Sequence, residues 1–179
     1  MLTLPVIRPA AVADAPAVTV LLHNLGYPVE PDRVAAGLRQ LLDDPGAFVV
    51  VAADDERGVV GLLSLSCRPV LRLQGVAATI EELAVRSDAR ARGVGDRLLR
   101  YAKGLASERG WVRLEMTVTR RREVTRRDFF DSRGFSRGDC VTYRWGRLEA
   151  RHPVLPALDR PRHHELVWPG KQAQIAPRT

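Results

Sequence analysis

Residues 90–95 read Arg-Ala-Arg-Gly-Val-Gly and lie between two stretches of different periodicity. The apolar run at 80–85 predicts a strand, and residues 96–103 predict a helix. The first amides of a helix have no partner within it and lie at the positive end of the helix dipole. Glycine lets an oxyanion approach the backbone. The turn is therefore predicted to bind a phosphate or diphosphate group.

Two adjacent carboxylates, Glu81 and Glu82, stand in the strand that leads to this turn. A carboxylate can take a proton from an attacking nucleophile or hold a cationic substrate. Neighbouring residues of a strand point to opposite faces, so only one of the two glutamates would face a cleft directly. Which one does so stays open, because such a strand can splay or bulge. The alternative without function is that one or both glutamates simply face solvent.

The turn differs in sequence from two familiar phosphate-binding loops. The chain has no Walker string G-x-x-x-x-G-K-[ST]. Gly93 and Gly95 begin a dinucleotide fingerprint, but Leu98 stands where its third glycine belongs, although Glu115 lies at about the distance of its acidic residue. The arginine three residues before Gly93 and the paired glutamates favour another kind of loop.

The pattern Arg90, Gly93 and Gly95 after an apolar strand resembles motif A of the GNAT family of acetyl-CoA-dependent N-acetyltransferases. The resemblance extends to a hairpin formed by 47–52 and 58–63, and to Phe-Phe-Asp-Ser-Arg-Gly-Phe at 129–135, which is similar to the family's F-Y-x-x-x-G-F segment. It covers about residues 4–145. It implies a GNAT-like α/β fold with a mixed sheet.

The resemblance also implies a co-substrate and a site. The co-substrate is acetyl-CoA, and the acceptor is an amine of a small molecule or a protein. The pantetheine arm is expected along the backbone of Leu83, Ala84 and Val85. The diphosphate is expected at Arg90, Ala91, Arg92, Gly93, Val94, Gly95 and Asp96. The Asp96 side chain is expected to point away from the phosphates.

Catalytic roles follow less directly. Glu81 is favoured as the base that deprotonates the amine, directly or through water, and Glu82 is the alternative base or the anchor of a cationic acceptor. The family commonly places a tyrosine, which protonates the departing thiolate, where this chain has Phe130, and an asparagine where it has Glu123. Solvent or Tyr143 could replace that acid. A catalytically weak or inactive acyl-CoA sensor is the alternative function.

The net charge is +7, and five arginines lie between 120 and 127. We expect them to form a solvated helix start, a wall of the coenzyme cleft or, less favoured, a nucleic-acid contact, since no aromatic residues alternate with them.

The sequence shows no membrane span, no secretion signal and no zinc-type cluster. A cytoplasmic protein is expected, with Cys67 and Cys140 as buried reduced thiols rather than a disulfide. The family resemblance allows a homodimer, which nothing in the sequence requires.

Periodicity predicts the element order β-α-α-β-β-β-α-β-α-β. The expected strands are 2–8, 47–52, 58–63, 80–85, 111–118 and 141–145, and the expected helices are 15–25, 32–42, 96–110 and 124–132. Asp14 and Asp32 are expected to cap the first two helices. The chain is divided into a GNAT-like domain, residues 1–147, and a proline-rich basic tail, 148–179, which we expect to be flexible.

Overall fold

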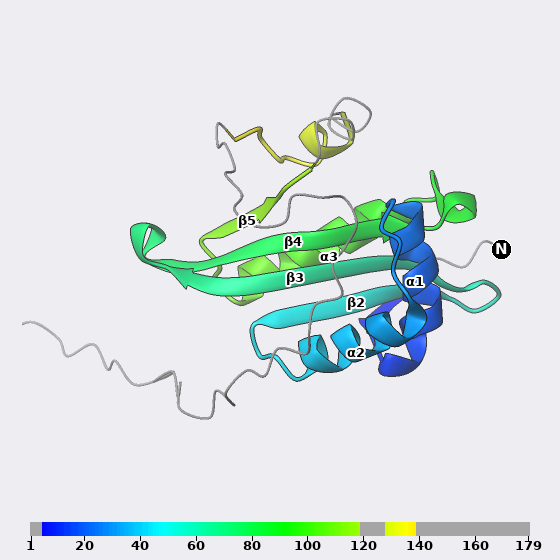
Figure 1. The fold of residues 1–179 in the computed structure, drawn as a ribbon. Helices are drawn as coiled ribbons and strands as arrows, with labels where there is room; N and C mark the ends of the chain where they lie inside the picture. Colours follow the sequence, from blue (N-terminus) through cyan, green and yellow to red (C-terminus); the bar gives the residue numbers. More distant parts are fainter. Residues whose placement is uncertain (1–4, 119–127, 139–179) are drawn as a thin grey trace, which may run out of the picture. The chain divides into compact units, whose positions relative to one another are not determined.

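The computed structural model describes residues 5–118 and 128–138, which all belong to one compact unit within Met1–Cys140 (Figure 1). The strands are β1 Val6–Pro9, β2 Ala47–Asp54, β3 Gly58–Val70, β4 Gly75–Val85 and β5 Arg113–Met116. The helices are α1 Ala15–Asn24, α2 Pro31–Leu42 and α3 Val94–Glu108, with 3-10 turns at η1 Val12–Asp14, η2 Leu71–Leu73 and η3 Ser87–Ala89. Residues 128–131 form a further helical turn.

The five strands form one mixed sheet in the order β1-β2-β3-β4-β5. The first three pairs are antiparallel and β5 runs parallel to β4. The predicted fold class and the first eight elements of the predicted order are therefore confirmed. Of the helix predicted over 124–132, the described part is helical at 128–131. The last predicted strand, the tail and the boundary at 147 lie outside the described residues.

The sheet has an apolar cluster on each face. On one face, residues such as Val50 and Leu63 pack with Leu98 and Leu99 of α3. On the other, alternate residues of the same strands pack with α1 and α2. Figure 1 shows α3 behind the sheet and α1 and α2 in front of it. The period-2 alternation of the strands thus supplies both cores.

The predicted helix caps are wrong in detail. Asp14 is the residue before α1, but its carboxylate makes no capping bond there. Its carboxylate forms a bidentate ion pair with Arg8, with both distances 2.8 Å, and accepts a hydrogen bond from the N–H of Ala11 at 2.8 Å. The Arg8 guanidinium, above all, lowers the pKa of Asp14. The cap residue of α2 is Glu30, because Pro31 occupies the first helical position, which suits a residue without an N–H.

The helical spacing of Val34, Leu38, Leu41 and Leu42 predicts one buried apolar stripe on α2, but this stripe is only half buried. Val34 and Leu38 are buried against the sheet, whereas Leu41 and Leu42 are exposed by 39% and 41%. Both exposed leucines lie in the last turn, which is followed by the turn at 43–46. The helical spacing identified the face correctly but not the point where α2 leaves the sheet.

Gly61 sets how closely α3 approaches the sheet. A Cβ built at this residue of β3 would lie 3.0 Å from Leu98 Cδ1 and 3.0 Å from Val94 Cγ1. Both contacts are on the first two turns of α3, and Val94 and Leu98 are themselves buried. A side chain at position 61 would therefore push the start of α3 away from β3 and β4.

We expect Gly61→Ala to destabilise the fold by about 1–3 kcal/mol, because it overpacks this contact. Denaturant unfolding at constant m-value measures the loss. The matched control is Gly104→Ala on α3, where a Cβ meets nothing within 4 Å, and which should stabilise by about 0.5–1 kcal/mol through helix propensity. Equal effects of the two substitutions would contradict this account of the packing.

Candidate active site

β4 bulges at the paired glutamates. Along the antiparallel pair, Ser64 lies opposite Glu82, but Leu65 lies opposite Ile80. Glu81 is therefore an extra residue without a partner on β3. A bulge of this kind breaks the period-2 alternation, so residues on its two sides change faces.

The bulge places both carboxylates on the same face of the sheet. Ser64 Oγ donates a hydrogen bond to Glu82, and Ser66 Oγ donates one to Glu81. Ser64 and Ser66 are two residues apart on a regular stretch of β3, so their side chains share a face. It is the face of Leu62, which packs with α1 and α2. The expectation that the two glutamates point to opposite faces is wrong, because the bulge at Glu81 breaks the alternation between them.

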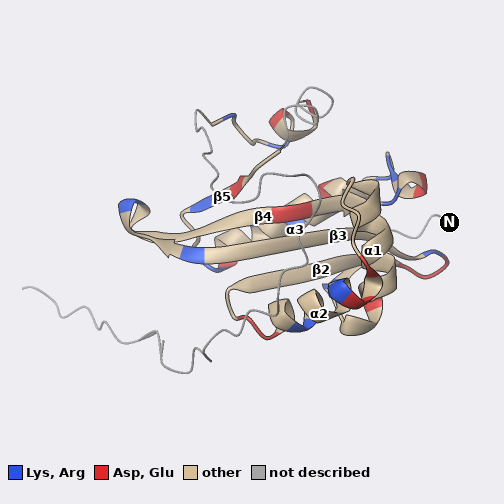
Figure 2. Cartoon of the chain, in the orientation of Figure 1, with Lys and Arg blue, Asp and Glu red and all other residues tan. Residues whose placement is uncertain are grey.

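The two carboxylates differ in environment. Glu81 is exposed, whereas Glu82 is partly buried beside the buried Ser64. Burial raises the pKa of the Glu82 carboxyl, the hydrogen bond from Ser64 opposes that rise, and the negative charge of Glu81 adds to it. Figure 2 shows this acidic segment on an otherwise uncharged stretch of β4. Unequal carboxyl groups side by side are typical of acid–base sites.

β5 leaves β4 at this point. The pairing ends at Ile80 with Met116, so within the described residues β5 does not pair with 81–85. The N–H of Arg86 donates to Val60 of β3 at 2.9 Å, and the N–H of Glu82 faces Ser64 Oγ at 3.2 Å. Within residues 82–86, the backbone N–H and C=O groups of the even-numbered residues therefore face β3.

By the same alternation, the backbone groups of Leu83 and Val85 face the open edge of β4. Their side chains pack against the cluster on the α3 side. The third residue expected there, Ala84, lies opposite Leu62, so its backbone groups face β3, and its side chain is buried on the α1 and α2 side. The open edge can receive an extended chain as an added strand would be received.

The turn before α3 presents free amides. Gly93, with φ at 76°, precedes the helix, and Ala91 also has a positive φ, at 61°. The first helical bond runs from the N–H of Arg97 to Gly93 O at 3.0 Å. The amides of residues 94–96 therefore have no partner within α3, and the described part of the chain supplies none. Residues 90–93 are exposed, as an anion site requires.

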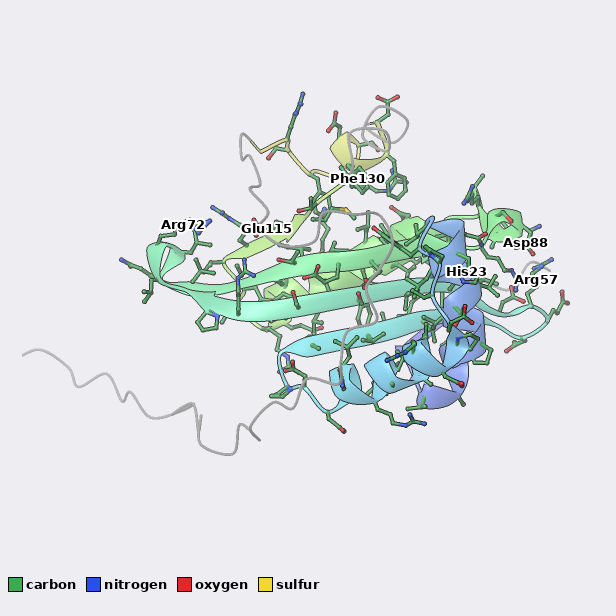
Figure 3. All side chains as sticks on the ribbon, in the orientation of Figure 1. His23, Arg57, Arg72, Asp88, Glu115 and Phe130 are labelled. Carbon is green, nitrogen blue, oxygen red and sulfur yellow. The ribbon has the colours of Figure 1, made fainter. Side chains whose placement is uncertain are left out.

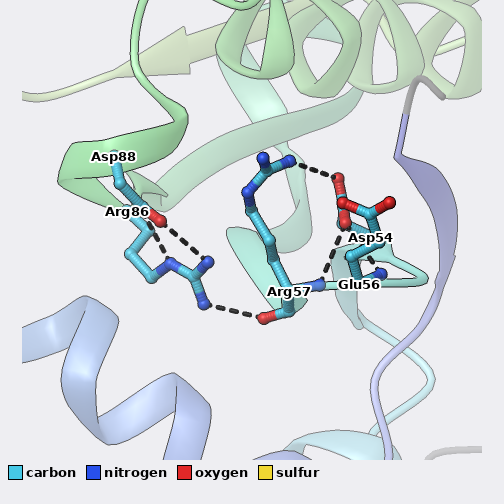
Figure 4. Close-up of polar contacts among 5 residues, drawn as sticks. All are labelled: Asp54, Glu56, Arg57, Arg86 and Asp88. Atoms are coloured by element: carbon cyan, nitrogen blue, oxygen red, sulfur yellow. Dashed lines mark hydrogen bonds and ion pairs between the residues drawn. The ribbon is translucent and has the colours of Figure 1, made fainter. Parts of the chain in front are cut away.

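The loop between β4 and α3 is held to the β2–β3 turn (Figure 4). Arg86 pairs with Asp88 through Nε at 2.7 Å and Nη2 at 3.0 Å, and its Nη1 donates to Arg57 O at 2.8 Å. Asp54 in turn accepts the N–H groups of Glu56 and Arg57, both at 3.0 Å. The hydrogen bond from Arg86, above all, lowers the pKa of Asp88. This network fixes the segment that leads to Arg90.

Asp96, in the first turn of α3, does not turn toward these amides. Its carboxylate pairs with Arg100 at 2.9 Å and with Arg133 at 3.0 Å. Arg133 belongs to the segment 128–138, which packs along α3. No local pattern predicts this contact, because 37 residues separate the two partners.

Phe130 lies on the helical turn 128–131 (Figure 3). Its ring makes edge-on contacts with Phe129, at 5.2 Å between ring centres, and with Phe135, at 6.3 Å. All three pack against the cluster on the α3 side. The residue at the family's tyrosine position is thus part of an apolar contact. Glu123, Tyr143 and the arginines of 120–127 lie outside the described residues.

Three further expectations concern features away from this site. No described helix is long and apolar enough to cross a membrane. Among the described residues no group of His, Cys, Asp and Glu is arranged to hold a metal ion. Cys67 is a free thiol, partly rather than fully buried, and burial is the main cause that raises its pKa to about 11. Cys140 lies outside the described residues.

A family model described as an acetyltransferase (GNAT) domain matches residues 45–137, about half of the chain and the part that holds all of these features. The chain belongs to the GNAT family. The match begins at the turn before β2 and ends after the Phe129–Phe135 cluster. No curated protein sequence matches the chain.

Solved structures share the GNAT fold. A transcriptional regulator from Bacillus halodurans C-125 is 26% identical, with a TM-score of 0.69 over 79% of this chain and 99% of the other. A GNAT family acetyltransferase from Staphylococcus aureus is 14% identical, with a TM-score of 0.66 over 80% and 99%. A ribosomal-protein-alanine N-acetyltransferase from Brucella melitensis is 21% identical, with a TM-score of 0.62 over 79% and 98%.

Relief of backbone strain tests the geometry of the turn. Ala91→Gly should stabilise the protein by about 0.5–1 kcal/mol, because an L residue with positive φ is strained and glycine is not, even after glycine's greater chain entropy. Thermal unfolding measures the gain. Ala106→Gly, within α3, should have the opposite sign. Destabilisation by Ala91→Gly would show that residue 91 does not adopt this conformation.

The Ser64 hydrogen bond is tested by titration. Ser64→Ala should raise the pKa of Glu82 further, because the hydroxyl stabilises the ionised carboxylate. NMR of the glutamate side-chain carboxyl carbons measures it, and Ser66→Ala, which removes the hydroxyl bound to Glu81, is the control. A pKa of Glu82 that stays the same or falls in Ser64→Ala would contradict the assigned contact.

Proposed function

We propose that this GNAT protein transfers the acetyl group of acetyl-CoA to an amine by direct attack. The observation that carries the proposal is the separation of β5 from β4 beside two carboxylates on one face. Further along the chain, the open edge of β4 is followed by the free amides at the start of α3. An extended thioester arm and its diphosphate require these two features in this order.

The residues present fit the coenzyme. The backbone groups of Leu83 and Val85 suit the amides of a pantetheine arm. The amides of 93–96, at the positive end of α3, suit a diphosphate. Arg90 and Arg92 are exposed on the same turn and can add positive charge. A Cβ at Gly95 would lie 3.3 Å from Phe129 Cζ, so the glycine lets the Phe129 ring lie against the helix start.

The environments of the glutamates support a division of roles. Glu82 is the better base, because burial raises its pKa toward the working pH while Ser64 holds it in place. This proposal reverses the order expected from the sequence, in which Glu81 is the favoured base. Glu81, exposed on the same face, anchors the acceptor as a cation before the proton leaves.

In the proposed step, a carboxylate takes one proton from the acceptor ammonium group. The nitrogen lone pair then forms a bond to the acetyl carbon while the carbon–sulfur bond breaks. The coenzyme leaves as a thiolate, a stable leaving group with a pKa close to that of a free thiol. The nitrogen loses its second proton to solvent, which leaves a neutral acetamide. Phe130 cannot protonate the thiolate, so its proton comes from solvent or from Tyr143. The products are an acetamide and coenzyme A.

The acceptor is a cationic amine. Two adjacent carboxylates on one face attract a positive charge and repel an anionic group. Lysine, a polyamine and an aminoglycoside all satisfy this requirement, whether the amine is that of a small molecule or of a protein.

Isosteric substitutions separate the two roles. Glu82→Gln should lower kcat about 100-fold, the usual effect of losing a general base. It should also remove the loss of activity as the pH falls through the pKa of Glu82. Glu81→Gln should mainly raise KM for a cationic amine, about tenfold. Steady-state kinetics across pH measures both, with Glu108→Gln, at the end of α3, as the control.

Calorimetry with coenzyme A accompanies the kinetics, because both glutamine variants should keep the coenzyme affinity of the parent protein. If Glu81→Gln abolishes kcat and Glu82→Gln does not, the roles are exchanged. If turnover persists unchanged in both, neither residue is the base.

Phe130 favours a second function, a catalytically weak acyl-CoA sensor. Its ring packs against two other phenylalanines and carries no proton that it could donate to a thiolate. The structure from Bacillus halodurans is described as a transcriptional regulator. Coenzyme binding without turnover across a panel of cationic amines would favour the sensor over the enzyme.

A further inference from the structure

The helix end that we propose for the diphosphate carries a carboxylate. Asp96 is the third residue of α3. A first-turn carboxylate is stabilised by the helix dipole, but it repels a second anion at the same end. It makes no capping bond to the start of its own helix. Another contact must therefore keep the Asp96 carboxylate from binding the amides that an external anion would use.

Two arginines hold this carboxylate. Arg100, one turn along α3, reaches it at 2.9 Å, but its side chain is 69% exposed. Arg133 reaches it at 3.0 Å, and its side chain is only 29% exposed. Exposed ion pairs within a helix contribute little. The more sheltered Arg133 is therefore the dominant partner.

Arg133 is fixed by contacts of its own. Its guanidinium lies 4.0 Å from the centre of the Phe129 ring, and its Nη1 donates to Phe129 O at 2.9 Å. The Phe129 ring lies against the start of α3, where a Cβ at Gly95 would be 3.3 Å from Phe129 Cζ. Lys103 of α3 donates to Arg133 O at 2.5 Å. A planar, charged side chain held in this way presents a constant partner to Asp96.

We propose that Arg133 is a positioning residue for the coenzyme: it pairs with Asp96 and keeps that carboxylate from competing with a diphosphate for the amide end of α3. The inference rests on the proposed coenzyme site. In this role the segment 128–138 contributes to coenzyme affinity, although Phe130 stands at the position of the family's tyrosine. It concerns binding and not the chemical step.

A double-substitution cycle tests the proposal, with coenzyme A as the probe in calorimetry. Arg133→Gln should weaken binding about fivefold, a change expected when a charge at a helix end is unmasked. Asp96→Ala should bind at least as tightly as the parent protein. The double variant should return to within about twofold of the parent, because no carboxylate remains to be masked.

Salt and charge variants separate masking from packing. The deficit of Arg133→Gln should shrink as the ionic strength rises, since salt screens the repulsion. Arg133→Lys, which keeps the charge but loses the planar contact with Phe129, should bind coenzyme A more tightly than Arg133→Gln even if its melting temperature falls. Arg39→Gln on α2, which packs on the other face of the sheet, is the control for charge alone.

The proposal is overturned if Asp96→Ala weakens binding as much as Arg133→Gln and the double variant is no better than either. That result would mean that the pair only fastens 128–138 to α3. If the parent protein itself does not bind coenzyme A, the proposed function fails first, and the two failures are told apart by that one titration.

Discussion

The point where β5 separates from β4 is the constraint on which the candidate site depends. β4 keeps its partner β3 throughout, but after Ile80 it has no described partner on its other edge. Beside this point the bulge at Glu81 brings both glutamates to the face of Ser64 and Ser66. The open backbone edge and the paired carboxylates therefore lie next to each other. A regular strand would not place both carboxylates on one face.

The start of α3 must lie at the end of that open edge, and several contacts fix it there. Gly61 lets the first turns approach β3, and Arg86 ties the preceding loop to the β2–β3 turn. Arg133 binds the first turn from the other side. Each contact joins segments far apart in the sequence. The amides before α3 are thus held in a fixed position, so that little ordering remains to be done when an anion binds.

Local patterns in the sequence were enough to predict the first eight elements, the mixed sheet and the turn at Arg90–Gly95. Periodicity and glycine positions depend on near neighbours, and these elements do too. The bulge at Glu81 could not be predicted, because it exists only relative to the register of β3. The exposure of Leu41 and the pair Asp96–Arg133 likewise depend on distant residues. The roles that we propose for Glu81 and Glu82 depend on burial and on Ser64, which distinguish two residues that look alike in the sequence.

The proposed site requires that a CoA thioester lies along the open edge of β4 with its diphosphate on the start of α3. A crystal structure of the protein with acetyl-CoA tests this placement most directly. We expect hydrogen bonds between the pantetheine amides and the backbone of Leu83 and Val85, with the acetyl group on the side of Glu81 and Glu82. A coenzyme bound elsewhere, or with β5 closed onto residues 81–85, would contradict it.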